Sequence, residues 1–95
     1  MRLKRVIFLS ISTLLLAPPA SAAGEEFFGL IESRPTQGDT GTWVIGGRSV
    51  EVTNKTSLDE DNGPFVIGAC VEVELDRHGG IAIEISTEGK LECRR

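Results

Sequence analysis

Few residues of this chain are of a type that does chemistry: two cysteines, one histidine and a run of carboxylates. His78 is the only histidine, and it lies in the glycine-containing segment Asp76–Gly80. A catalytic triad needs an imidazole held rigidly beside a serine and a carboxylate, which such a turn does not provide. One histidine with Cys70 and Cys93 also leaves a tetrahedral zinc site short of ligands. We therefore predict no catalytic residue, no enzymatic activity and no cofactor.

The two cysteines are predicted to form a structural disulfide. Gly89 offers a turn between Ser86 and Cys93, so the C-terminal tail can fold back to Cys70. Redox-active pairs are usually close together in sequence and have a depressed thiol pKa. The core of a domain near 70 residues contributes only about 3–5 kcal/mol, and this bridge would add about 3 kcal/mol in the chain-entropy model.

The acidic run at 59–61 is similar to part of a calcium-binding loop. Asn62-Gly63 follows it, and glycine occupies the sixth position of an EF-hand loop. That alignment places Leu58 and Ala69 at the first and twelfth positions, which require acidic oxygen donors. An EF-hand is therefore excluded, and the run is either a weak cation site or a solvated loop that shields a sheet edge. The candidate ligands are Asp59, Glu60 and Asp61.

The N-terminus predicts an exported protein. A basic start is followed by a 12-residue apolar run, Val6–Ala17, and then by the small residues Ala20-Ser21-Ala22, which is typical of a signal peptide. Spanning a bilayer takes about 20 apolar residues, so a membrane anchor is not expected. We predict a signal peptide over 1–22 with cleavage after Ala22, or one residue later after Ala23. A single domain over 23–95 would then be periplasmic or secreted.

The predicted mature chain is acidic, with seven basic against fourteen acidic residues and a net charge near −7. Proteins that bind single-stranded nucleic acid combine a positively charged groove with exposed aromatic side chains. Only four aromatic residues follow residue 22. We therefore expect no nucleic-acid partner.

The composition after residue 22 predicts an all-β fold. It contains twelve valines and isoleucines, only four leucines, and all eleven glycines of the chain. Such a mixture favours strands broken by tight turns. The expected strands cover 27–33, 42–45, 48–53, 70–75 and 81–86, with a short sixth near 55–58 or 65–67.

Two hairpins follow from the pattern. Gly46-Gly47 forms a two-residue loop of the kind that primed turns need, which sets Trp43 opposite Val50 on the buried face. The second hairpin turns through residues 76–80 and is expected to pair Val73 with Ile83. The residues expected in the core are Trp43, Val50, Val71, Val73, Leu75, Ile81, Ile83 and Ile85.

The same alternation places three glutamates of the second hairpin on the solvent face. These are Glu72, Glu74 and Glu84. In the expected register Glu72 lies directly opposite Glu84, which is mildly unfavourable for stability and leaves the outer face acidic.

Short motifs spread over residues 27–86 resemble the bacterial domain of unknown function family 5666. They are Phe28-Gly29-x-Ile31, Thr42-Trp43-x-Ile45-x-Gly47, Val50-x-Val52, Thr56, Gly68-x-x-Val71-x-Val73 and Ala82-x-x-Ile85. The resemblance implies a small barrel-like β domain, often exported, with no assigned activity and no catalytic residues. A more distant similarity is to periplasmic proteins of the oligonucleotide/oligosaccharide-binding (OB) fold. The expected architecture is a small antiparallel β-barrel of five or six strands, OB-like.

Two classes of function fit these expectations. The first is a non-enzymatic binding or structural module whose acidic face or acidic loop contacts a protein, an envelope component or a small cationic ligand. The second is a periplasmic OB-like binder of a small ligand or cation at the barrel mouth. The carboxylates could also serve only to keep the sheet soluble.

Overall fold

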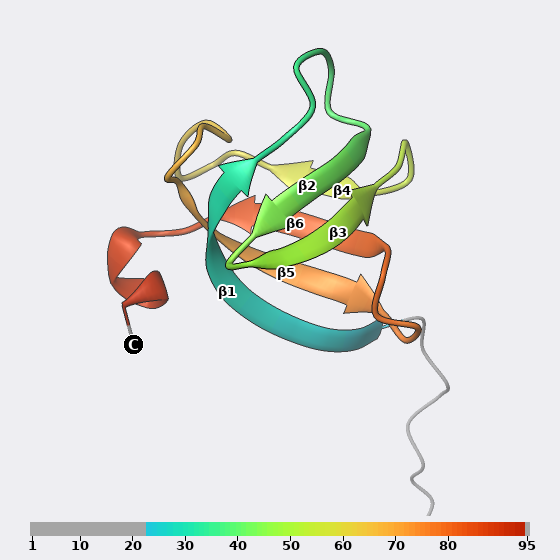
Figure 1. Ribbon diagram of the computed structural model, residues 1–95. Helices are drawn as coiled ribbons and strands as arrows, with labels where there is room; N and C mark the ends of the chain where they lie inside the picture. The colour runs from blue at the N-terminus through green and yellow to red at the C-terminus, as the bar shows by residue number, and fades with distance from the viewer. Residues whose placement is uncertain (1–22, 95) are drawn as a thin grey trace, which may run out of the picture.

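The computed structural model describes residues 23–94, and nearly all of their regular structure is β (Figure 1). The strands are β1 (Ala23–Ser33), β2 (Gly41–Ile45), β3 (Arg48–Val52), β4 (Ser57–Asp59), β5 (Cys70–Asp76) and β6 (Ala82–Thr87), followed by the 3₁₀ turn η1 (Lys90–Cys93). The all-β prediction is therefore confirmed. The predicted signal peptide and its cleavage site at Ala22 lie outside the described residues.

Within the described part of the chain, no helix has the length and apolar character needed to cross a membrane.

The six strands form one mixed sheet in the order β3-β2-β1-β5-β6-β4. Four pairings are antiparallel, but β4 pairs with β6 in parallel, so the prediction of an antiparallel barrel is wrong in that respect. β3 also approaches the start of β6 in parallel, at the single bridge between Glu51 and Ile81. The sheet is not closed into a barrel by continuous pairing.

Strand β1 holds the two halves of the sheet together, and it curves strongly along its length (Figure 1). Residues 23–30 pair with β5, whereas residues 31–33 pair with β2. Gly29 is buried close to the point where the pairing changes from β5 to β2. A Cβ atom at Gly29 would lie 3.0 Å from both Cα and N of Gly46 in the β2–β3 turn. The Gly46 N–H also donates to the Leu30 carbonyl oxygen at 2.9 Å, so the turn packs directly on the backbone of β1.

The first hairpin has the predicted register. Trp43 lies opposite Val50, and the two central turn residues, Gly46 and Gly47, have φ angles of 58° and 79°. Both angles lie in the left-handed region that glycine adopts without a steric penalty. The prediction of a two-residue primed turn is confirmed.

The second hairpin has a different register from the predicted one. Val73 pairs with Ile85 rather than with Ile83, and a bulge between Glu74 and Leu75 adds Ile83 as an extra residue on β6. Ile83 is half-buried as a result.

The turn explains this shift. The Asp76 N–H donates to the Ile81 carbonyl oxygen at 2.8 Å, so residues 77–80 form the loop and Ile81 closes it. Ile81 is 45% exposed, and Ala82, 1% exposed, takes the core position instead. The Asp76 carboxylate accepts hydrogen bonds from the Gly80 and Ile81 amides. Partial desolvation raises the pKa of Asp76, but hydrogen bonds from these amides outweigh it, and the net shift is downward.

One contiguous apolar core lies against the inner face of the sheet. Its buried members are Ile31, Trp43, Ile45, Val50, Val52, Phe65, Val71, Val73, Leu75, Ala82 and Ile85. Six of the eight predicted core residues are among them, and the exceptions are Ile81 and Ile83.

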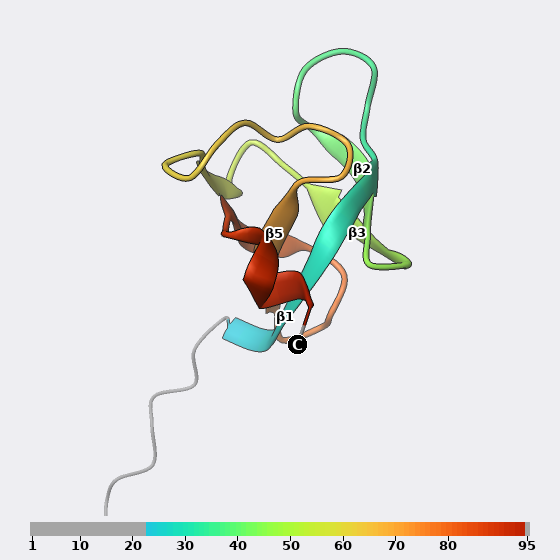
Figure 2. The ribbon, with the colours of Figure 1, turned by 90° about the vertical axis from the view of Figure 1, so that its left-hand side faces the viewer.

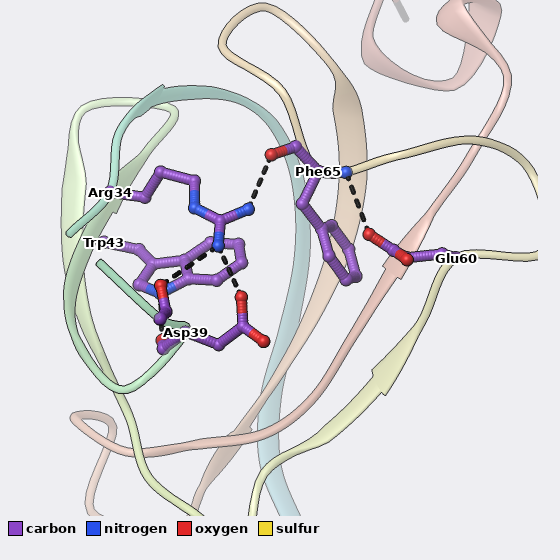
Figure 3. Close-up of polar contacts among 6 residues, drawn as sticks. Arg34, Asp39, Trp43, Glu60 and Phe65 are labelled. Carbon is purple, nitrogen blue, oxygen red and sulfur yellow. Dashed lines mark hydrogen bonds and ion pairs between the residues drawn. The ribbon is translucent and has the colours of Figure 1, made fainter. Parts of the chain in front are cut away.

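Trp43 is fully buried, and the loop after β1 closes over it (Figure 3). Its indole N–H donates to the Asp39 carbonyl oxygen at 2.7 Å, and Phe65 meets the indole edge-on with 5.4 Å between centroids. The Arg34 guanidinium stacks 4.5 Å from the indole centroid, donates to the Phe65 carbonyl oxygen at 2.6 Å and pairs with the Asp39 carboxylate. These contacts fix the 34–40 loop and the segment around Phe65 over the same end of the core.

Gly29→Ala is expected to lower the free energy of unfolding by about 1–3 kcal/mol, the usual cost of overpacking a core position. The added methyl group would press on the backbone of Gly46, which cannot move without displacing the hairpin turn. Gly89→Ala is the matched control, because Gly89 has open space around its Cβ position and a φ of −67°. Urea denaturation of both variants measures the effect; equal stabilities would contradict the close approach at Gly29.

Candidate functional site

The residues that sequence analysis singled out do not converge on a reactive centre. His78 is exposed at the tip of the second hairpin. Among residues 23–94, no three histidine, cysteine or acidic side chains are placed to hold a metal ion together.

The carboxylates of the 59–61 loop brace the loop itself. Asp59 accepts a hydrogen bond from the Asp61 N–H at 2.8 Å. Glu60 accepts one from the Phe65 N–H at 3.3 Å, which ties the loop to the aromatic end of the core (Figure 3). The structure therefore does not bring Asp59, Glu60 and Asp61 together as cation ligands.

The glutamates of the second hairpin, in contrast, gather on the outer face, meaning the side of β1, β5 and β6 that is turned away from the core. Glu74 of β5 lies directly opposite Glu26 of β1 and directly opposite Glu84 of β6. We call these three residues the acidic row. With Glu72 and Ser86, they line a shallow hollow of about 40 Å³.

Glu72 lies in the most negative part of the outer face. Burial raises the pKa of Glu72, and the neighbouring carboxylates raise it further. Those neighbours are Glu26, Glu88, Glu84 and Glu74. Every charged group that shifts Glu72 is therefore acidic, so this face carries a concentrated negative field.

Sequence analysis found two members of the acidic row and missed the third. The predicted first strand began at residue 27, whereas β1 begins at Ala23 and includes Glu26. The local sequence also does not say which strands are neighbours, so the pairing of β1 with β5 was not predicted. The expected contact of Glu72 with Glu84 is wrong, because the shifted register sets Glu74 opposite Glu84 and Glu72 opposite Ser86.

The C-terminal tail covers the far end of the same face. Cys70 lies opposite Leu30, yet it is only 2% exposed, because η1 contacts both β1 and β5 there (Figure 2). Cys70 and Cys93 are joined by a disulfide with a Cα–Cα distance of 5.9 Å. The predicted pairing of the two cysteines is present in the structure.

Two apolar side chains of β1 stand exposed between the acidic row and the tail. Phe28 is 44% exposed and pairs with Glu72, and Leu30 is 45% exposed and pairs with Cys70. We call Phe28 and Leu30 the apolar pair. The outer face is thus acidic at one end, apolar in the middle and covered by η1 at the other end.

A larger open cleft of about 390 Å³ lies between the 62–69 segment and the chain leaving β6. Val66 and Ile67 line it and are 54% and 62% exposed. The buried Thr87 lies in the wall of the cleft. The Thr87 carbonyl oxygen accepts a hydrogen bond from the side-chain amide of Asn62 at 3.0 Å. The cleft has the size of a small-ligand site.

No protein-family model, curated protein or solved structure matches this chain.

Replacing Cys70 and Cys93 together with alanine is expected to lower the free energy of unfolding by about 3 kcal/mol, because the bridge closes a loop with a sequence separation of 23. Denaturant melts of the wild type and the double variant measure this loss. The intact mass of the purified protein, with and without reductant, reports the bond itself. Two free thiols in the unreduced protein would contradict it.

Glu72→Gln is expected to raise the free energy of unfolding at neutral pH by about 0.2–1 kcal/mol, because it removes a partly desolvated charge from among neighbouring glutamates on adjacent strands. The raised pKa means that the folded protein binds this proton more tightly than the unfolded chain does. Protonation of Glu72 at lower pH therefore removes its unfavourable charge in the wild type. The difference in free energy of unfolding between the variant and the wild type then shrinks as the pH falls through the raised pKa. Urea denaturation across this pH range measures the difference.

The control for Glu72 is Glu32→Gln, which removes the same charge from an exposed position of β1. This change should alter stability by less than about 0.5 kcal/mol at every pH. A pH-independent gain at Glu72, or an equal gain at Glu32, would show that the clustered charges are not the cause.

Proposed function

We propose that this protein is an exported, non-enzymatic binding module whose acidic outer face contacts a cationic segment of a protein or envelope partner. The observation that carries the proposal is the acidic row. Glu26, Glu74 and Glu84 lie side by side across three strands. Like charges directly opposite each other destabilise a sheet, and positions that break such a rule are expected where function requires them.

The physical effect of this face would be to attract and orient positive charge. Several like charges on one surface focus a field that raises the association rate of an oppositely charged partner. Salt at physiological strength screens such fields beyond about 8 Å, so the interaction is expected to weaken as the salt concentration rises.

The proposal includes export and an OB-like architecture. A disulfide between Cys70 and Cys93 fits an oxidising compartment. The parallel approach of β3 and β4 to β6 supports a barrel-like arrangement of the kind that the resemblance to family 5666 implies.

The alternative function, a small-ligand binder, is favoured by the 390 Å³ cleft beside the disulfide. Thermal shifts in the presence of calcium, polyamines and oligosaccharides test it, since a ligand specific for the folded state raises the melting temperature. A marked rise with an oligosaccharide would favour the cleft over the acidic face.

The acidic face is tested with a fluorescent oligolysine peptide. Changing Glu26, Glu74 and Glu84 to glutamine is expected to weaken binding by about tenfold at low salt, because three exposed ion pairs of a few tenths of a kcal/mol each are lost. Fluorescence anisotropy at low and high salt measures the affinity, and wild type and variant should converge at high salt.

The matched control removes three acidic charges from scattered exposed positions, with Glu32→Gln, Glu51→Gln and Asp61→Asn in one protein. Its net charge equals that of the face variant. If both variants lose the same affinity, net charge alone attracts the peptide and the acidic face is not a binding surface.

A further inference from the structure

We infer that the outer face binds an extended amphipathic segment, with basic side chains on the acidic row and apolar side chains on Phe28 and Leu30. This inference rests on the proposed function and names the class of its partner. It adds to that function a requirement for apolar contact at a defined distance from the charges.

The spacing on β1 sets the pattern of the partner. Glu26, Phe28 and Leu30 point to the same side of the strand, because each pairs with an outward-facing position of β5. Residues two apart on one strand face are about 7 Å apart. A partner segment in extended conformation repeats its own side chains at the same interval, so basic-x-apolar-x-apolar places one side chain against each of these three residues.

The charges around the apolar pair require a partner that carries basic as well as apolar side chains. Glu72 lies directly opposite Phe28, and Glu74 lies opposite Glu26, so carboxylates flank the apolar pair on the β5 side. An uncharged apolar segment would desolvate these carboxylates without compensation, which costs free energy. A second copy of this chain would bring its own carboxylates against these, and the like charges would repel each other. A segment with lysine or arginine beside its apolar residues satisfies both halves of the surface.

The disulfide limits how far the segment can extend. Beyond Leu30 the outer face is occupied by η1, which contacts β1 and β5 and is tied to Cys70 through Cys93. The docking surface therefore ends at Leu30.

Two synthetic peptides of equal charge test the inference. One carries the pattern Lys-Ser-Leu-Ser-Leu-Ser in tandem, which keeps every lysine and leucine on one face of an extended strand, and the other has serine in place of every leucine. The wild type is expected to bind the leucine peptide about five- to tenfold more tightly, because the apolar pair is removed from water only by that peptide. Phe28→Ser with Leu30→Ser should abolish this preference and leave the affinity for the serine peptide unchanged.

The control variant carries Val66→Ser and Ile67→Ser, which removes two side chains that are even more exposed but line the cleft. It should keep the preference for the leucine peptide. Amide chemical shifts of the isotope-labelled wild type give a reading that does not depend on any variant folding. On addition of the leucine peptide, the amide chemical shifts are expected to change at residues 26–30 and 72–74 and not at 65–67.

The outcomes separate this inference from the proposed function. If the glutamine variant of the acidic row loses both peptides while the serine variant of the apolar pair treats them as the wild type does, the acidic face binds charge alone and the inference is wrong. If the leucine peptide shifts residues 65–67 instead, the cleft is the apolar site and the inference is also wrong. Binding of neither peptide by the wild type would overturn both.

Discussion

The close approach of the β2–β3 turn to the backbone of β1 at Gly29 is the constraint on which the rest of the sheet depends. Because Gly29 has no side chain, the turn residue Gly46 can pack against it, and β1 can pass from β5 to β2 within one continuous strand. That passage brings Ile31 into the core and turns Glu26 and Phe28 outward beside β5. The core and the outer face are therefore two consequences of one curved strand.

Two side-chain devices hold the loops of this domain against the sheet. Arg34 covers Trp43 on the core side and donates to the carbonyl group of Phe65 (Figure 3). The disulfide fastens η1 over the outer face at Cys70 (Figure 2). Both use long-range contacts to restrain segments that lack strand pairing, which matters for a domain with so small a core.

Local sequence patterns predicted the features that depend on neighbouring residues, such as the first hairpin turn. They failed for the features that depend on contacts between distant segments, such as strand register and strand order. The first hairpin was predicted to the residue because Gly46-Gly47 fixes its turn. The register of the second was wrong because Asp76 bonds to Ile81 across a loop of residues 77–80 and a bulge admits Ile83, and alternation of apolar residues does not reveal a bulge. Likewise, the pairing of β1 with β5 puts Glu26 in the acidic row, and nothing near Glu26 in the sequence indicates that neighbour.

The shifted register changes which carboxylates of the outer face lie opposite one another. In the predicted pairing, Glu72 and Glu84 formed one repulsive contact between two strands; in the structure, Glu74 meets a carboxylate on each side, and the repulsion spans three strands. Carboxylates kept only for solubility could be spread over the sheet without loss, whereas a row of them beside exposed Phe28 and Leu30 lowers stability and exposes apolar surface in the same place. A partner that neutralises the row and covers the apolar pair would remove both costs in a single contact.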